Sequence, residues 1–106
     1  MRPEVLKGHL DTLILSTLAA GPAHGYAVIE ALKAGSRGAL DLPEGTVYPA
    51  LHRLEEAGLL RSRWSEHDGR KRRVYALTGT GRRRLDAYRG EWRQLRSVVS
   101  TLLGES

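Results

Sequence analysis

The chain has 106 residues, which is enough for one hydrophobic core but not for two independent ones. It contains no cysteine, which excludes disulfides, zinc-thiolate sites and cysteine nucleophiles. Its net charge of +5 is uneven: residues 1–60 carry five Lys or Arg against seven Asp or Glu, and residues 61–93 carry eleven against four. A local basic segment fits a polyanionic partner, nucleic acid before membrane, or a solvated face, and charge alone does not separate these.

The longest apolar stretch lies around residues 13–20 and is interrupted by Ser16 and Thr17. It falls short of the roughly 20 residues that a membrane span needs. The N-terminal sequence shows no hydrophobic signal region with a cleavage site. We therefore expect a cytoplasmic protein with no membrane partner.

Two short helices are predicted in the first part of the chain. Between residues 6 and 18, apolar side chains recur every three or four positions, which predicts a helix that ends at Gly21-Pro22. A second helix is expected over residues 24–34, followed by the natural breaker Gly35. The residues expected on its buried face are Tyr26, Ile29 and Leu32.

A third helix is predicted to end at Gly58. The residues expected on its inward face are Val47, Ala50, Leu51, Leu54 and Ala57. Two prolines leave its start open. The helix begins either near Thr46, with Pro49 in the tolerated first turn, or at Pro43, with a distortion at Pro49.

A β-hairpin follows the three helices. Residues 59–64 and 73–77 are rich in strand formers, and the Asp68-Gly69 pair between them is a strong turn signal. Helix, helix, helix and hairpin is the element order of a winged helix-turn-helix. We therefore predict a mainly α fold with a β-hairpin, in which residues 1–78 form the DNA-binding domain.

The last helix is predicted to run from an N-cap at Thr78 or Thr80 to about Leu103. Its apolar residues are spaced alternately three and four apart, as in a coiled-coil seam: Leu85, Tyr88, Trp92, Leu95, Val99 and Leu102. Residues 79–106 could fold back on their own domain. We favour a homodimerisation helix instead, because the preceding elements form a closed unit and small domains gain stability by oligomerising.

The candidate DNA contacts lie on the third helix and at the hairpin tip. The outward positions of the helix offer groups that bind base edges or phosphates: Thr46, Tyr48, Pro49, His52 and Arg53. Among them, Arg53 is the strongest base reader if it reaches a guanine. The tip, which begins at the turn residue Gly69, continues with cations that can enter a minor groove: Arg70, Lys71 and Arg72. Double-stranded DNA is therefore the expected partner.

The sequence shows none of the common residue patterns of an enzyme active site. The four histidines fall on different predicted elements without metal-ligand spacing, so neither a metal site nor a cofactor is expected. No nucleophile elbow, phosphate-binding loop or dinucleotide fingerprint occurs. Glu55 and Glu56 are adjacent on a helix and point in different directions, unlike a catalytic carboxylate pair.

Four stretches together carry a family resemblance: residues 10–15, His24-Gly25-Tyr26, residues 45–55 with Gly58-Leu59, and residues 72–78 followed by Gly81. In these stretches the chain resembles the short members of the PadR family of transcriptional regulators. The resemblance implies a repressor that binds inverted-repeat operators as a two-fold dimer, with the C-terminal helix and the first helix forming the interface. It also implies that the Tyr48-Pro49 helix reads DNA and that residues 69–72 form the wing.

Some members of this family respond to small aromatic or phenolic compounds. Trp92 lies on the predicted seam, where a paired indole could stack a planar ligand or serve as ordinary interface core. A different class of function is also open, in which the apolar helix seam joins another protein and the basic segment only aids solubility. Such an adaptor would be monomeric in isolation and would not bind DNA specifically.

Overall fold

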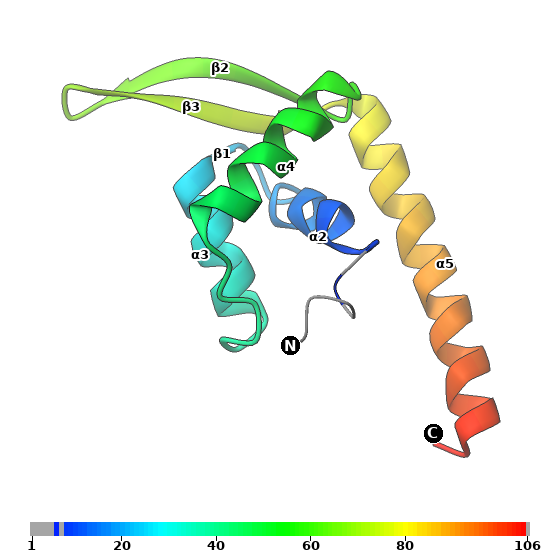
Figure 1. Ribbon diagram of the computed structural model, residues 1–106. Helices are drawn as coiled ribbons and strands as arrows, with labels where there is room; N and C mark the ends of the chain where they lie inside the picture. The colour runs from blue at the N-terminus through cyan, green and yellow to red at the C-terminus, as the bar shows by residue number, and fades with distance from the viewer. Residues whose placement is uncertain (1–5, 7, 106) are drawn as a thin grey trace.

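The computed structural model describes residues 6 and 8–105. Its elements in chain order are α2 (Leu10–Thr17), β1 (Ala23–His24), α3 (Gly25–Gly35), α4 (Glu44–Glu56), β2 (Leu60–His67), β3 (Arg70–Leu77) and α5 (Gly79–Leu103). The helices α2, α3 and α4 gather under one end of the long hairpin, whereas α5 runs away from that end (Figure 1). The predicted mainly α fold with a β-hairpin is confirmed.

One hydrophobic core lies where α2, α3 and α4 meet the base of the hairpin and the first turns of α5. Its largest fully buried side chains come from all these elements: Tyr75, Ile14, Leu15, Leu18, Leu51, Leu60, Leu85, Val28 and Val47. Burying each large apolar side chain of this kind stabilises the fold by about 1.5–3 kcal/mol. No helix in the described part of the chain is both long and apolar enough to cross a lipid bilayer.

The first predicted helix is shorter than its apolar pattern indicated. Gly8 adopts a left-handed conformation with φ of +87°, and α2 begins only at Leu10. Glycine reaches this conformation without a steric penalty, so the chain turns there. Leu6 and Leu10 still pack against the core, although no single helix joins them.

Helix α3 lies close to its predicted range, but the expectation for Tyr26 was wrong. His24 caps the helix, because its Nδ1 accepts a hydrogen bond from the Ala27 amide at 3.1 Å. Val28 is fully buried, whereas Tyr26 is 53% exposed. The two lie roughly 200° apart around the helix axis, so they cannot share one face.

Helix α4 follows the second of the two predicted alternatives. It starts after Pro43, whose carbonyl accepts the Thr46 amide at 3.0 Å, and it contains Pro49 in its second turn. Proline has no amide to offer the Gly45 carbonyl, and both residues lie on the exposed side, where water can replace the lost bond. Ala57, expected to face inward, is exposed and ends the helix instead.

The hairpin is longer than predicted and joins a third strand. Its turn residues both have positive φ, +52° at Asp68 and +75° at Gly69, which is the two-residue type I′ turn that an Asp-Gly pair favours. The short strand β1 pairs antiparallel with β3, with His24 opposite Val74, in the sheet order β1-β3-β2. The sequence analysis did not predict β1.

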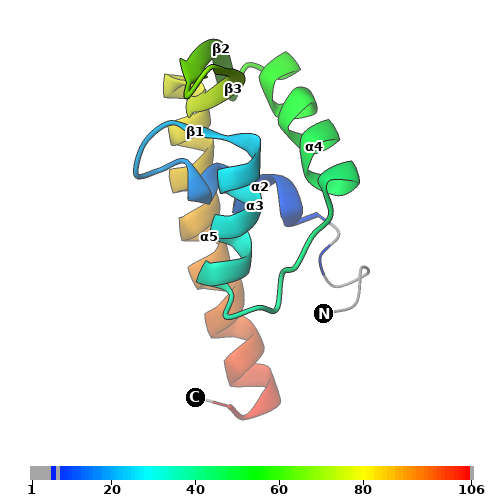
Figure 2. The ribbon, with the colours of Figure 1, turned by 90° about the vertical axis from the view of Figure 1, so that its left-hand side faces the viewer.

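Helix α5 starts at one of its two predicted caps. The Thr78 hydroxyl accepts the Gly81 amide at 3.0 Å and donates to the Gly58 carbonyl at 2.6 Å. Leu85 is only 2% exposed and belongs to the chain's own core, which corrects its place on an intermolecular seam. The C-terminal part of the helix projects past the other elements, and the molecule measures 55 Å along its longest axis (Figure 2).

Candidate nucleic-acid interface

The outer side of α4 presents three of the predicted contact residues to solvent. Pro49, His52 and Arg53 are exposed, and Thr46 is half-buried at the edge of this side. The opposite side packs into the core through Val47 and Leu51, so the helix is held along its length. An exposed face on a firmly packed helix is what major-groove binding requires.

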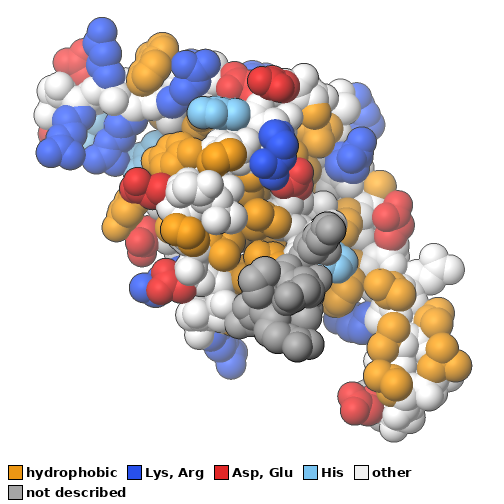
Figure 3. All heavy atoms as spheres, in the orientation of Figure 1, with side chains coloured by type: hydrophobic (Ala, Val, Ile, Leu, Met, Phe, Trp, Pro, Cys, Tyr) orange, Lys and Arg blue, Asp and Glu red, His pale blue; other side chains and the backbone are white. Residues whose placement is uncertain are grey.

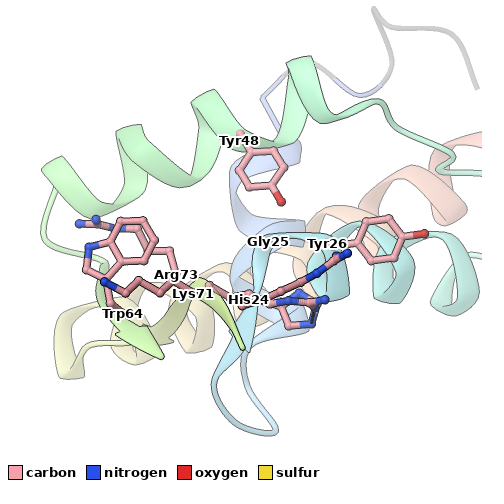
Figure 4. A pocket seen from close by; sticks show the side chains of 9 residues that line it. His24, Gly25, Tyr26, Tyr48, Trp64, Lys71 and Arg73 are labelled. Carbon is pink, nitrogen blue, oxygen red and sulfur yellow. Dashed lines mark hydrogen bonds between the residues drawn. The ribbon is translucent and has the colours of Figure 1, made fainter. Parts of the chain in front are cut away.

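Tyr48 points to the flank of α4 that faces α3. It is half-buried, and its ring covers the backbone of Gly25 at the start of α3 (Figure 4). A Cβ atom at position 25 would overlap this ring, so only glycine fits there without a shift. Tyr48 therefore positions α4 on α3, and only its outer edge is available to a ligand.

Arg53 is paired within the protein. Its Nη2 lies 3.0 Å from Oδ1 of Asp11 on α2, and the two side chains are 58% and 47% exposed. An ion pair this exposed contributes about 0.2–1 kcal/mol. Arg53 thus ties α4 to α2, and it can reach a base only by sharing or leaving Asp11.

The cations of the hairpin alternate between its two faces. Lys71 and Arg73 lie on the same face as the buried Tyr75, whereas Arg70 and Arg72 lie on the opposite face. The strand register adds two exposed arginines of β2, Arg61 and Arg63, to that opposite face. Sequence analysis did not include either among the basic residues of the wing, although their alternation with Leu60 in a predicted strand was a usable signal.

His24 and Arg72 meet at the base of the wing. His24 Nδ1 accepts the Ala27 amide, and its Nε2 lies 2.9 Å from an Arg72 guanidinium nitrogen. A neutral imidazole has one acceptor nitrogen, so the ring satisfies only one of these two donors at a time. Burial, followed by the charge of Arg72, lowers the pKa of His24.

A second polar contact fixes the wing to α4. The Ser62 hydroxyl donates to Glu55 Oε2 at 2.5 Å and accepts from Arg73 Nε at 2.8 Å. Arg73 Nη2 also lies 3.9 Å from the same Glu55 oxygen. Glu55 is on the last turn of α4, so these bonds set the position of the inner wing face relative to the helix.

An open groove of about 550 Å³ runs between α4, the start of α3 and the wing. Its lining combines aromatic and cationic side chains: His24, Gly25, Tyr26, Tyr48, Trp64, Arg70, Lys71, Arg72 and Arg73 (Figure 4). Lys and Arg side chains gather at the far end of the hairpin (Figure 3). Within residues 8–105, no three His, Asp or Glu side chains come close enough to hold a metal ion.

The far half of α5 carries most of the exposed large apolar side chains. On this helix, those more than 40% exposed are Trp92, Leu95, Val98, Val99, Leu102 and Leu103. Four of them belong to the predicted seam, and Val98 and Leu103 extend it. Tyr88 is half-buried, and its hydroxyl lies 2.6 Å from His9 Nδ1, which braces α5 against the start of α2.

Comparison with known proteins agrees with this arrangement. A transcriptional regulator of Mycobacterium tuberculosis is 41% identical over 91 residues, which cover 86% of this chain and 79% of that protein. A crystallised PadR family regulator from Eggerthella lenta has a TM-score of 0.82 at 35% identity, covering 94% of this chain and 86% of that one. A PadR family regulator from Clostridium difficile gives 0.81 at 34% identity, covering 91% and 99%.

The sequence profile of the transcriptional regulator PadR-like family matches residues 14–87, which run from the core of α2 into α5. This match confirms the resemblance seen in the sequence motifs. The chain belongs to the PadR-like family of transcriptional regulators.

Proposed function

We propose that this regulator is a sequence-specific repressor that binds an inverted-repeat operator as a homodimer. The observation that carries the proposal is the exposed side of α4, with Pro49 and His52, lying beside a wing that ends in consecutive cations. A helix in the major groove reads the base sequence, and cations at the adjacent minor groove bind phosphate.

The wing tip is suited to bind DNA rather than the protein itself. Arg70 and Lys71 are exposed, and neither side chain forms an ion pair or hydrogen bond with another described residue. Cations that are already solvated and unpaired can neutralise phosphates without first breaking an internal contact. Release of counterions from the DNA then drives binding.

The apolar strip of α5 supports the homodimer. Six large apolar side chains, 41–80% exposed, follow one another on a helix that projects beyond the rest of the molecule. A contiguous patch of this kind marks an interface, and seam spacing suits a second helix of the same kind. Two-fold pairing would present two copies of α4 to one duplex, with half-sites about one helical turn apart.

A binding titration tests the proposal with the DNA upstream of the protein's own coding region. Wild-type protein is expected to bind it more tightly than an unrelated duplex, with affinity falling steeply as salt rises. Arg70→Ala and Lys71→Ala should each lower the slope of log affinity against log salt by about one unit per lost phosphate contact. Arg93→Ala, which removes an exposed arginine on the side of α5 away from the apolar strip, is the matched control.

Unchanged affinity in both wing variants would contradict the wing's role. No preference for the upstream DNA over the unrelated duplex would contradict sequence-specific binding there. A monomer that binds no duplex would instead favour the protein-binding adaptor.

Relief of repression by a small aromatic compound is a further part of the proposal. Trp92 is 44% exposed and contacts the His9 ring edge-on, with the ring centroids 6.0 Å apart. An indole at a dimer axis offers a planar compound a stacking surface. Quenching of tryptophan fluorescence together with DNA release is expected on binding, and Trp92→Leu should abolish both.

A further inference from the structure

The wing carries a large aromatic side chain, Trp64, that is not part of the hydrophobic core and does not belong to the cationic wing tip. Trp64 is 63% exposed, although it lies on the inner face of β2, the face that also carries the buried Leu60. It lines the end of the groove between α4 and the wing (Figure 4). The indole faces a groove that is also lined by Tyr48 and several cations, so it is placed to contact a ligand bound there.

Trp64 is held by the contacts that join the wing to α4. Arg73 lies directly opposite it in the strand register, with the guanidinium carbon 5.2 Å from the centroid of the indole ring. Arg73 donates a hydrogen bond to the Ser62 hydroxyl, which in turn donates one to Glu55 of α4. One face of the indole is therefore covered by a fixed cation, while most of the side chain stays open to solvent.

The lining of the groove is cationic. Near Trp64, Lys71 and Arg73 share the inner wing face. Toward the start of α3, Arg72 lies beside His24. Among the described residues, the lining holds four Lys or Arg side chains and no Asp or Glu, so it attracts a phosphate.

The geometry of duplex DNA indicates what would occupy the groove. In a duplex, one sugar-phosphate strand separates each major groove from the neighbouring minor groove. A protein that places α4 in the major groove and its wing tip in the minor groove must pass that strand between them. The groove lined by Tyr48 and Trp64 lies in this interval.

We propose that the indole of Trp64 packs against a deoxyribose of the strand that crosses this groove, with Lys71 beside the adjoining phosphate and Arg73 as the residue that positions the indole. The proposal rests on the proposed function and adds a contact to it. Because every nucleotide has the same sugar and phosphate, this contact contributes affinity and no sequence preference.

The test compares Trp64→Ala and Trp64→Phe with the wild-type protein on the upstream duplex and on an unrelated duplex. Trp64→Ala is expected to weaken binding to both by the same factor, roughly tenfold, which is typical for loss of one aromatic packing contact. The salt slope should not change, because no charge is removed. Trp64→Phe keeps an aromatic ring and should retain most of the affinity.

Fluorescence gives an independent readout. The wild-type emission should change on duplex binding, and this change should be lost in Trp64→Phe, which retains only Trp92. Ser62→Ala tests the positioning role of Arg73: at a temperature where the variant is folded, it should reduce the emission change and the affinity. A Ser62→Ala protein with wild-type emission change and affinity would overturn that role.

The outcomes separate this contact from the proposed function. If wild-type protein binds the duplex and Trp64→Ala binds it equally well, the Trp64 contact is refuted while the regulator function stands. If Trp64→Ala weakens binding to only one of the two duplexes, the contact is not with the sugar-phosphate strand. If wild-type protein binds neither duplex, the proposed function fails and the contact fails with it.

Discussion

Leu85 and Leu95 both lie on the predicted helical seam but should respond differently to mutation. Leu85 is 2% exposed in the core of its own chain, whereas Leu95 is 49% exposed on the projecting part of α5. Truncating a buried leucine to alanine costs about 2–5 kcal/mol, because the transfer energy is lost and a cavity remains. For a domain of this size, a loss of about 3 kcal/mol lowers the melting temperature by roughly 12–24 °C.

Two measurements distinguish these roles. Thermal unfolding followed by circular dichroism should show the large decrease for Leu85→Ala and a smaller one for Leu95→Ala. Sedimentation of dilution series, at a temperature where both variants are folded, should show weaker dimerisation for Leu95→Ala and wild-type dimerisation for Leu85→Ala. Equal weakening of the folded dimer in Leu85→Ala and Leu95→Ala would contradict the different roles of the two leucines.

Three further predictions concern stability. Gly25→Ala should lower the free energy of unfolding by about 1–3 kcal/mol, because the new Cβ overlaps the Tyr48 ring. In denaturant titrations this loss should disappear in a Tyr48→Ala background, and an equal loss in both backgrounds would contradict the overlap. Folding lowers the pKa of His24 below its ordinary 6.5, so below pH 6.5 the unfolded chain binds a proton more readily than the folded chain, and His24 should destabilise the fold as the pH falls through 6.5. The free energy of unfolding, measured at neutral and mildly acidic pH, should therefore decrease less in His24→Asn than in the wild-type protein, and an equal decrease would count against this role. Thr78→Ala removes the hydroxyl that accepts the Gly81 amide and should cost about 1 kcal/mol; Thr78→Ser should retain most of the wild-type melting temperature, and a Ser variant as unstable as the Ala variant would show that the hydroxyl is not the cause.

Local sequence signals predicted the elements whose cause is local. Asp68-Gly69 forms the expected type I′ turn because both residues tolerate positive φ. Thr78 caps α5 as expected because its hydroxyl needs only an amide three residues away. The strand β1 has only two residues, too few for a periodic pattern, and its partner Tyr75 is more than 50 positions distant.

Sequence periodicity finds an apolar face but does not say what covers it. Leu85 and Leu95 follow the same spacing, yet one is buried by its own chain and the other stays exposed. The candidate site shows the same limit. Arg53 lies on the outward half of α4, but its ion pair with Asp11 joins residues 42 positions apart, which helical spacing cannot reveal.

Two chains joined through α5 should place two copies of α4 and the wing on one duplex. Native mass spectrometry of the protein titrated into its upstream DNA measures this stoichiometry directly. We expect complexes with two chains per duplex and no populated complex with a single chain. Saturation of the duplex by one chain would contradict pairing through α5.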